Sequence, residues 1–127
     1  MTPDELRSRY REYLDICNRH ELDMLTDYLA ERIRVNETSR TRSEYVDDLA
    51  ALFESFPDYR WALVRDVVEE HWIAVHLRDS GTRAGPFRGA PGDGALVTTD
   101  EFAIYHFTEQ GLIEHVETTA DNARLTS

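Results

Sequence analysis

The chain has 127 residues, a formal net charge of −11, and 14 basic residues, none of which is a lysine. This length suits one domain, residues 1–127, with one hydrophobic core. The negative charge disfavours nucleic acid and anionic membranes as partners, and the absence of lysine excludes Schiff-base chemistry. The single cysteine, Cys17, excludes an internal disulfide. Since no apolar run could cross a bilayer and the first residues lack a signal-peptide pattern, we expect a cytoplasmic protein.

Two capping-box patterns predict helix starts in the first half of the chain. Thr2 precedes Glu5, and Thr41 precedes Glu44, by the three residues that let each side chain bind the other's backbone N–H. Apolar residues follow both patterns at helical spacing, which predicts helices that run to about Asn18 and to residue 56.

The segment between these two helices has weaker patterns. Apolar residues at helical spacing over residues 22–29 predict a further helix, which makes three in all. Residues 33–35 are typical of a short strand, and the polar residues 37–40 of a solvated loop.

The second half of the chain changes to a period of two, which indicates β-strands. We expect strands over residues 59–69, 71–80, 95–107 and 112–120, with the glycine-rich segment 81–94 joining the second to the third. Helices followed by a sheet with one long irregular connection predict an α+β half-cone that can enclose a small apolar ligand.

Five stretches of this sequence together match one known pattern: Asn18 to Asp23, Phe56-Pro57-Asp58-Tyr59-Arg60, Gly81-Thr82 through Phe87-Arg88-Gly89, Phe102 to Phe107, and Gly111-Leu112-Ile113 to Asp121. On these stretches nearly the whole chain resembles the SnoaL-like polyketide and ester cyclases of the NTF2-like superfamily, which includes ketosteroid isomerase. The resemblance implies an α+β, cystatin-like barrel: a cone-shaped curved antiparallel sheet closed by three N-terminal helices, usually as a homodimer. It also implies ring closure by intramolecular aldol condensation without a cofactor.

The same resemblance points to three catalytic candidates. Asp121 matches the acid/base aspartate of the cyclases, and Tyr13 matches the isomerase tyrosine that donates a hydrogen bond to the substrate oxyanion. Glu37 falls where the isomerases keep their catalytic aspartate. Two positions depart from the family pattern. Ala103 stands where the isomerases have a second acid in the oxyanion hole and about where the cyclases have a histidine. Glu117 stands where ester cyclases commonly have a tryptophan. The first departure counts against ordinary steroid isomerisation.

The chemistry of these residues supports the candidates on separate grounds. Burial of a carboxylate in an apolar pocket raises its pKa, which suits it to exchange protons with weak carbon acids. Asp121 is such a group if it points inward, and otherwise it is an exposed cap. Tyr13 or Asn36 would then stabilise an enolate or alkoxide oxygen, unless Tyr13 is an ordinary core residue and Glu37 part of a solvated loop.

Other residues are candidates for the substrate-binding wall. Trp61, Phe87 and Tyr105 supply flat aromatic surface, with Phe87 as a lid. His115 shares the strand face of Asp121 if the strand is unbroken, although a β-bulge would reset that register. His76 lines either the cavity or a dimer face. No histidine shows metal-ligand spacing, so we expect no metal and no cofactor.

The leading functional hypothesis is a cofactor-independent cyclase or isomerase that uses carboxylate acid/base chemistry on a small apolar carbonyl metabolite, with a polyketide-like substrate favoured. One alternative is an epoxide hydrolase or hydratase, in which Glu37 and Asp121 together activate water. The other is a non-catalytic module that binds a small molecule or serves as a dimeric scaffold. A cavity filled by the protein's own aromatic side chains would favour the scaffold.

Overall fold

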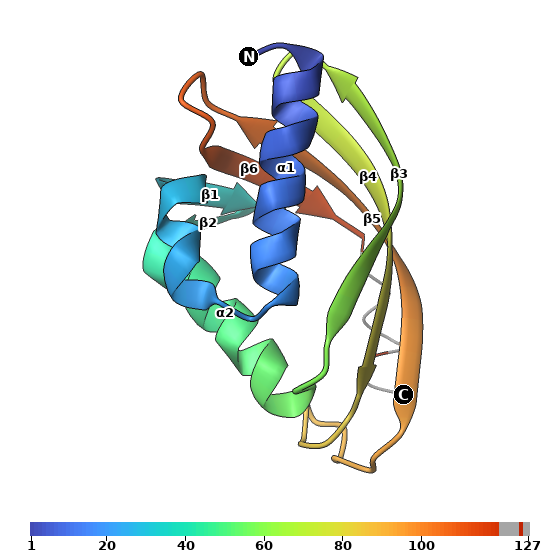
Figure 1. Cartoon of the computed structure of the whole chain (residues 1–127). Helices are drawn as coiled ribbons and strands as arrows, with labels where there is room; N and C mark the ends of the chain where they lie inside the picture. The colour runs from blue at the N-terminus through green and yellow to red at the C-terminus, as the bar shows by residue number, and fades with distance from the viewer. Residues whose placement is uncertain (120–124, 126–127) are drawn as a thin grey trace.

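The computed structural model describes residues 1–119 and residue 125. In this part of the chain, six strands form one curved sheet and three helices lie against its concave side (Figure 1). The predicted α+β architecture is therefore confirmed. No helix among the described residues is long and apolar enough to cross a membrane.

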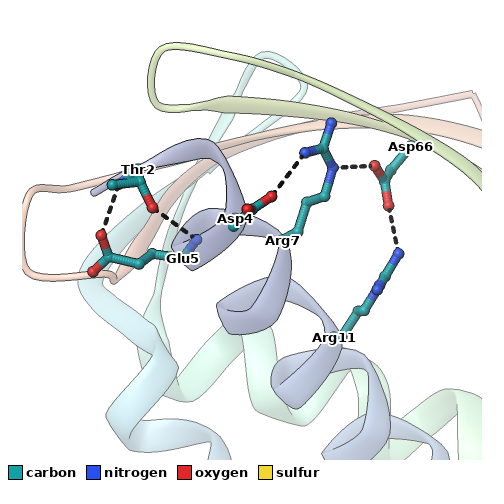
Figure 2. Close-up of polar contacts among 6 residues, drawn as sticks. All are labelled: Thr2, Asp4, Glu5, Arg7, Arg11 and Asp66. Atoms are coloured by element: carbon teal, nitrogen blue, oxygen red, sulfur yellow. Dashed lines mark hydrogen bonds and ion pairs between the residues drawn. The ribbon is translucent and has the colours of Figure 1, made fainter.

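Helix α1 (Pro3–Asn18) begins at the predicted capping box. The Glu5 backbone N–H donates to the Thr2 hydroxyl oxygen at 3.2 Å, and the Thr2 backbone N–H donates to the Glu5 carboxylate at 3.0 Å (Figure 2). These two bonds satisfy N–H groups that have no partner inside the helix, which is why the helix starts at this point.

Two arginines of α1 connect the helix to strand β3 (Arg60–Glu69), the edge strand of the sheet. Arg7 Nε and Arg11 Nη2 donate to the two carboxylate oxygens of Asp66, at 2.8 and 3.2 Å (Figure 2). The Asp66 side chain is only 8% exposed, so this shared pair is better shielded from water than an ordinary surface ion pair. It fixes α1 across the concave face of the sheet.

The segment after α1 differs from the prediction in three ways. Residues Leu22–Tyr28 form a 3₁₀ helix (η1), and strand β1 (Leu29–Val35) starts earlier than expected. The predicted loop contains strand β2 (Thr38–Thr41), which pairs antiparallel with β1. Its side chains are exposed or half-buried polar groups, so β2 lacks the apolar alternation by which a strand is recognised in a sequence.

Helix α2 (Arg42–Ser55) starts at the second predicted capping box, formed by Thr41 and Glu44. Of its residues only Ser55 is fully buried, whereas Tyr45, Leu49 and Leu52 are half-buried. The apolar side of this helix therefore faces an open space and not a filled core.

Strands β4 (Trp72–Thr82), β5 (Leu96–Phe107) and β6 (Ile113–Thr118) lie close to their predicted ranges. The order in the sheet is β2-β1-β6-β5-β4-β3, and neighbours are antiparallel except β1 and β6, which are parallel. The register shifts where His106 pairs with His115 but Phe107 pairs with Ile113. This β-bulge turns both Ile113 and Val116 toward the core.

The core lies between α1 and the sheet. Alternate residues of β4 and β5 point inward, and with the apolar face of α1 they form a buried cluster that includes Leu6, Tyr10, Ile73, Val75, Leu77, Ala103, Tyr105 and Phe107. Cys17 is 2% exposed, and burial raises the pKa of its thiol to about 12. It is therefore a small core residue and not a reactive thiolate.

The glycine-rich connection between β4 and β5 is fastened to the end of α2. The backbone N–H groups of Ala84 and Gly85 donate to the Ser55 carbonyl oxygen at 2.9 and 3.1 Å, and the Ser55 hydroxyl donates to the Pro86 carbonyl oxygen at 2.6 Å. Arg83 is 2% exposed and forms an ion pair with Asp93 at 3.1 Å. These contacts hold the connection beside the open side of α2.

Candidate functional site

A pocket of about 700 Å³ lies between α2, the second half of α1 and the concave face of the sheet. Its wall is largely apolar and aromatic, and the aromatic side chains are Tyr13, Tyr45, Tyr59, Trp61, Phe87 and Tyr105. The volume falls in the range of sites for small molecules. The protein's own aromatic side chains line this space without filling it, so there is room for a ligand.

The turn after α1 positions the aromatic side chains at the start of β3. The Asn18 amide donates to the Trp61 carbonyl oxygen at 2.9 Å and accepts from the Trp61 N–H at 2.8 Å. The His20 ring nitrogen is 2.8 Å from the Tyr59 carbonyl oxygen, and the His20 ring stacks on Phe53. Tyr59 and Trp61 then meet edge to face, with ring centroids 4.8 Å apart. Bonds to the backbone therefore fix this part of the wall.

Two tyrosine hydroxyls contact each other at the pocket wall. The Tyr13 and Tyr45 oxygens are 2.6 Å apart, and either hydroxyl can be the donor. Burial raises the pKa of both groups well above the ordinary value, so both stay protonated at neutral pH. When one O–H donates to the other oxygen, the second O–H is left for a carbonyl or enolate oxygen of a ligand.

Adjacent strands bring two carboxyl groups together on the concave face. Asp79 on β4 is 1% exposed and Glu101 on β5 is 8% exposed. Because Leu77 pairs with Glu101 and Asp79 pairs with Thr99, the two carboxyl-bearing residues are diagonal neighbours. Glu101 lines the pocket, whereas Asp79 is not among the lining residues.

Hydroxyl groups hold this carboxyl pair from both sides. The Tyr59 hydroxyl donates to Asp79 Oδ2 at 2.9 Å, and the Thr118 hydroxyl donates to Glu101 Oε2 at 2.9 Å. Burial raises the pKa of Asp79 well above its ordinary value, and the hydrogen bond and negative charge of Glu101 act in the same direction. Within the described residues, Asp79 Oδ1 makes no hydrogen bond.

The described residues provide no set of ligands for a resident metal ion. Among residues 1–119 and 125, no group of three or more histidine, cysteine, aspartate or glutamate side chains could hold one.

Five of the residues predicted from the sequence line the pocket: Tyr13, Asn36, Trp61, Phe87 and Tyr105. Phe87 lies on the glycine-rich connection and packs edge to face against Phe56, with centroids 5.5 Å apart. Asn36 has a positive φ of 54° in the turn after β1, and its side-chain oxygen accepts from the Thr118 N–H at 2.9 Å. The structure brings these residues together, and their roles toward a substrate stay predictions.

The other predicted site residues lie elsewhere. Glu37 is exposed in the turn between β1 and β2 and is not part of the pocket lining. His76 is on the outer face of β4, opposite the buried Val75 and Leu77. His115 is on the outer face of β6, since the β-bulge gives the inner face of that strand to Val116 and Thr118. Asp121 lies outside the described residues, so its role stays a prediction.

The carboxyl pair is the feature that the sequence analysis missed. Glu101 and Asp79 each occupy a position where the alternation of β4 or β5 calls for an inward, apolar side chain. A carboxylate at such a position is a signal that could have been read from the sequence.

A second hollow, of about 640 Å³, lies on the outer face of the sheet. Its lining includes His76 and Phe102, whose rings stack with centroids 4.4 Å apart, and Phe102 is 54% exposed. Val67, also on this face, is 60% exposed. Apolar patches of this kind are typical of interaction surfaces.

A six-stranded curved sheet whose concave side is covered by three helices over an apolar pocket defines the NTF2-like class of α+β proteins. Residues 7–127 match the family model of the SnoaL-like polyketide cyclases, so the chain belongs to that family. A search of curated proteins found no match.

Solved structures agree with this assignment. A SnoaL-like polyketide cyclase from Agrobacterium tumefaciens is 26% identical, with 94% of each chain covered and a TM-score of 0.85. TsrD from Streptomyces laurentii is 18% identical, with 98% of this chain and 94% of that chain covered and a TM-score of 0.87. IdmH from Streptomyces antibioticus is 18% identical over 94% of each chain, with a TM-score of 0.82. The family and the Agrobacterium tumefaciens structure support a cyclase or isomerase type of function, and the other two structures show the same fold.

Proposed function

We propose that the protein is a cofactor-independent cyclase or isomerase that acts on a small apolar carbonyl metabolite, with a polyketide-like compound as substrate. One observation carries this proposal: an open pocket of about 700 Å³ combines aromatic walls with buried hydroxyl groups and a carboxyl group. Aromatic walls suit a flat ring system, and the polar groups suit proton transfer at a carbonyl.

The reaction begins with removal of a proton from the carbon next to a carbonyl. A carboxylate takes this proton, and the resulting enolate oxygen accepts a hydrogen bond from the free O–H of the Tyr13–Tyr45 pair. In ring closure, the enolate carbon attacks a second carbonyl of the same molecule, and the alkoxide that forms takes a proton back from the carboxylic acid. Asp121 is the acid/base candidate by resemblance to the family.

The two alternatives have less support. The hydration mechanism needs Glu37 beside Asp121, and Glu37 is an exposed turn residue outside the pocket lining. The scaffold hypothesis expects a cavity filled by aromatic side chains, whereas this pocket is open.

Three further features belong to this proposal. The protein acts in the cytoplasm, its metabolite belongs to antibiotic biosynthesis, and it forms a homodimer through the outer sheet face, where Phe102 and Val67 are exposed. Sedimentation or size-exclusion measurements on a Phe102→Asp variant test the dimer, which we expect to dissociate.

Deuterium exchange tests the proposed chemistry without knowledge of the natural substrate. The bicyclic ketone 2-tetralone is incubated with the protein in D₂O, and proton NMR follows the loss of signal from the carbons next to the carbonyl. We expect the wild-type protein to accelerate exchange over buffer, and Asp121→Asn to lose about 10²- to 10⁴-fold of the acceleration while keeping its circular dichroism spectrum.

Two results would count against the proposal. Exchange at the buffer rate with wild-type protein speaks against proton-transfer chemistry on ketones. Full exchange by Asp121→Asn speaks against the aspartate as the acid/base group.

A further inference from the structure

The carboxyl pair of Asp79 and Glu101 has no role in the family pattern described above, and the surrounding residues give it one. Both side chains are almost fully buried, at 1% and 8% exposure, on neighbouring strands of the concave face. Two ionised carboxylates in such a place would repel each other strongly and lose their hydration. A single shared proton removes this repulsion.

Hydrogen-bond partners assign the proton to one side of the pair. The Thr118 hydroxyl donates to Glu101 Oε2 and the Tyr59 hydroxyl donates to Asp79 Oδ2, so each carboxyl group already accepts one bond. Asp79 Oδ1 is left without a partner of standard geometry within the described part of the chain. A proton on this oxygen, directed to Glu101, satisfies it and leaves Glu101 as the acceptor.

The two carboxyl groups differ in their position relative to the pocket, so they can have different roles. Glu101 is part of the pocket lining, and Asp79 is not. The negative charge of Glu101 is felt by several buried groups around the pocket, since it raises the pKa of Tyr45, Tyr105 and Cys17. The charges that act on Asp79 itself are those of Glu101 and of Asp100, which lies on the outer face.

We propose that Asp79 and Glu101 share one proton, and that the neutral Asp79 positions Glu101 as a second proton-transfer group of the pocket. This inference rests on the proposed function, because that chemistry needs both a proton acceptor and a proton donor. In each exchange event Glu101 takes a proton from the carbon next to the carbonyl, the carboxylic acid so formed exchanges this proton for a solvent deuteron, and the enolate carbon takes up the deuteron. Asp79 keeps its own proton throughout and holds the Glu101 carboxylate at the pocket wall.

Infrared spectroscopy tests the shared proton independently of activity. At neutral pH we expect the wild-type protein to show the C=O stretching band of a protonated carboxylic acid, and Asp79→Asn to lack it. Absence of the band in the wild type, or its persistence in Asp79→Asn, overturns the assignment of the proton to Asp79.

The 2-tetralone exchange assay tests the role of Glu101. We expect Glu101→Gln to lose at least about 10²-fold of the acceleration, whereas Asp100→Asn, the adjacent outward-facing carboxylate on β5, keeps it. Asp79→Asn retains part of the activity, with a pH profile shifted from that of the wild type, which a merely structural role would not produce. Exchange at the wild-type rate by Glu101→Gln overturns the proton-transfer role of Glu101. An unshifted pH profile in Asp79→Asn overturns the positioning role of Asp79.

The infrared experiment and the exchange assay together separate this inference from the proposed function on which it rests. If the wild-type protein fails to exchange 2-tetralone, the proposed function and the role of Glu101 in it are overturned together. The infrared band then still decides whether the pair holds a proton.

Discussion

Replacement of Asp79 by asparagine should change how the stability of the protein depends on pH. Asparagine has nearly the shape of a protonated aspartate, can accept the hydrogen bond from the Tyr59 hydroxyl, and can donate to Glu101. It does not titrate. The variant should therefore fold, and it should lack the proton that the wild-type protein takes up on folding.

The size of the effect follows from the raised pKa of Asp79. Between the pKa of the unfolded chain, near 4, and the higher pKa of the folded state, the folded wild-type protein binds one more proton than the unfolded chain. This stabilisation is complete below the unfolded value and is lost as the pH rises toward the folded one. The free energy of unfolding of the wild type relative to Asp79→Asn should therefore fall by about 1.4 kcal/mol per pH unit, roughly 4 kcal/mol from pH 5 to pH 8.

Urea unfolding of both proteins at pH 5, 6, 7 and 8, followed by circular dichroism, measures this difference. Asp100→Asn is the matched control: its contact with His76 lies at the surface, with the Asp100 side chain 52% exposed, so its difference from the wild type should change much less over this range than that of Asp79→Asn. A constant difference for Asp79→Asn would show that Asp79 is ionised in the folded protein and would refute the reasoning.

Three further outcomes are expected. Tyr13→Phe should slow 2-tetralone exchange by about 10-fold or more, because the ligand oxygen loses part of its hydroxyl pair with Tyr45; an unchanged rate would argue against that pair. Phe87→Ala should weaken the binding of 2-tetralone in calorimetry by up to about 10-fold, because one aromatic contact is lost, and it should cost little stability. Equal affinity would exclude Phe87 as a wall residue. Asp66→Asn should cost about 1 kcal/mol in urea unfolding, since Arg7 and Arg11 lose their shared partner; unaltered stability would mean that this link is weak.

Much of the fold could be predicted from the sequence because local signals agreed with the final structure. The capping boxes at Thr2 and Thr41 are contacts within three residues of the chain, and the structure contains both. The long strands β4 and β5 have one buried side, so their alternation is clear. In contrast, β2 is a polar strand held by backbone pairing with β1, and no side-chain pattern marks it.

The candidate site could be predicted only in part, because tertiary contacts decide which side chains face the pocket. Trp61 and Phe87 were recognisable as surplus aromatic surface, and both line the pocket. Strict alternation would have placed His115 on the same face as Ile113, but the β-bulge between them leaves Ile113 in the core and His115 on the outer face. Asp79 and Glu101 are 22 positions apart in the chain, and their proximity depends on the β4–β5 register, which no local sequence pattern reveals.

A crystal of the wild-type protein soaked with 2-tetralone gives the most direct test of the central claim, that this pocket holds an apolar ketone against its polar groups. The account predicts the rings between Trp61 and Tyr105, with the carbonyl oxygen at hydrogen-bond distance from the hydroxyl of Tyr13 or Tyr45. A saturating soak that leaves the pocket without the ketone, or that places the ketone only on the outer face of the sheet, would contradict it.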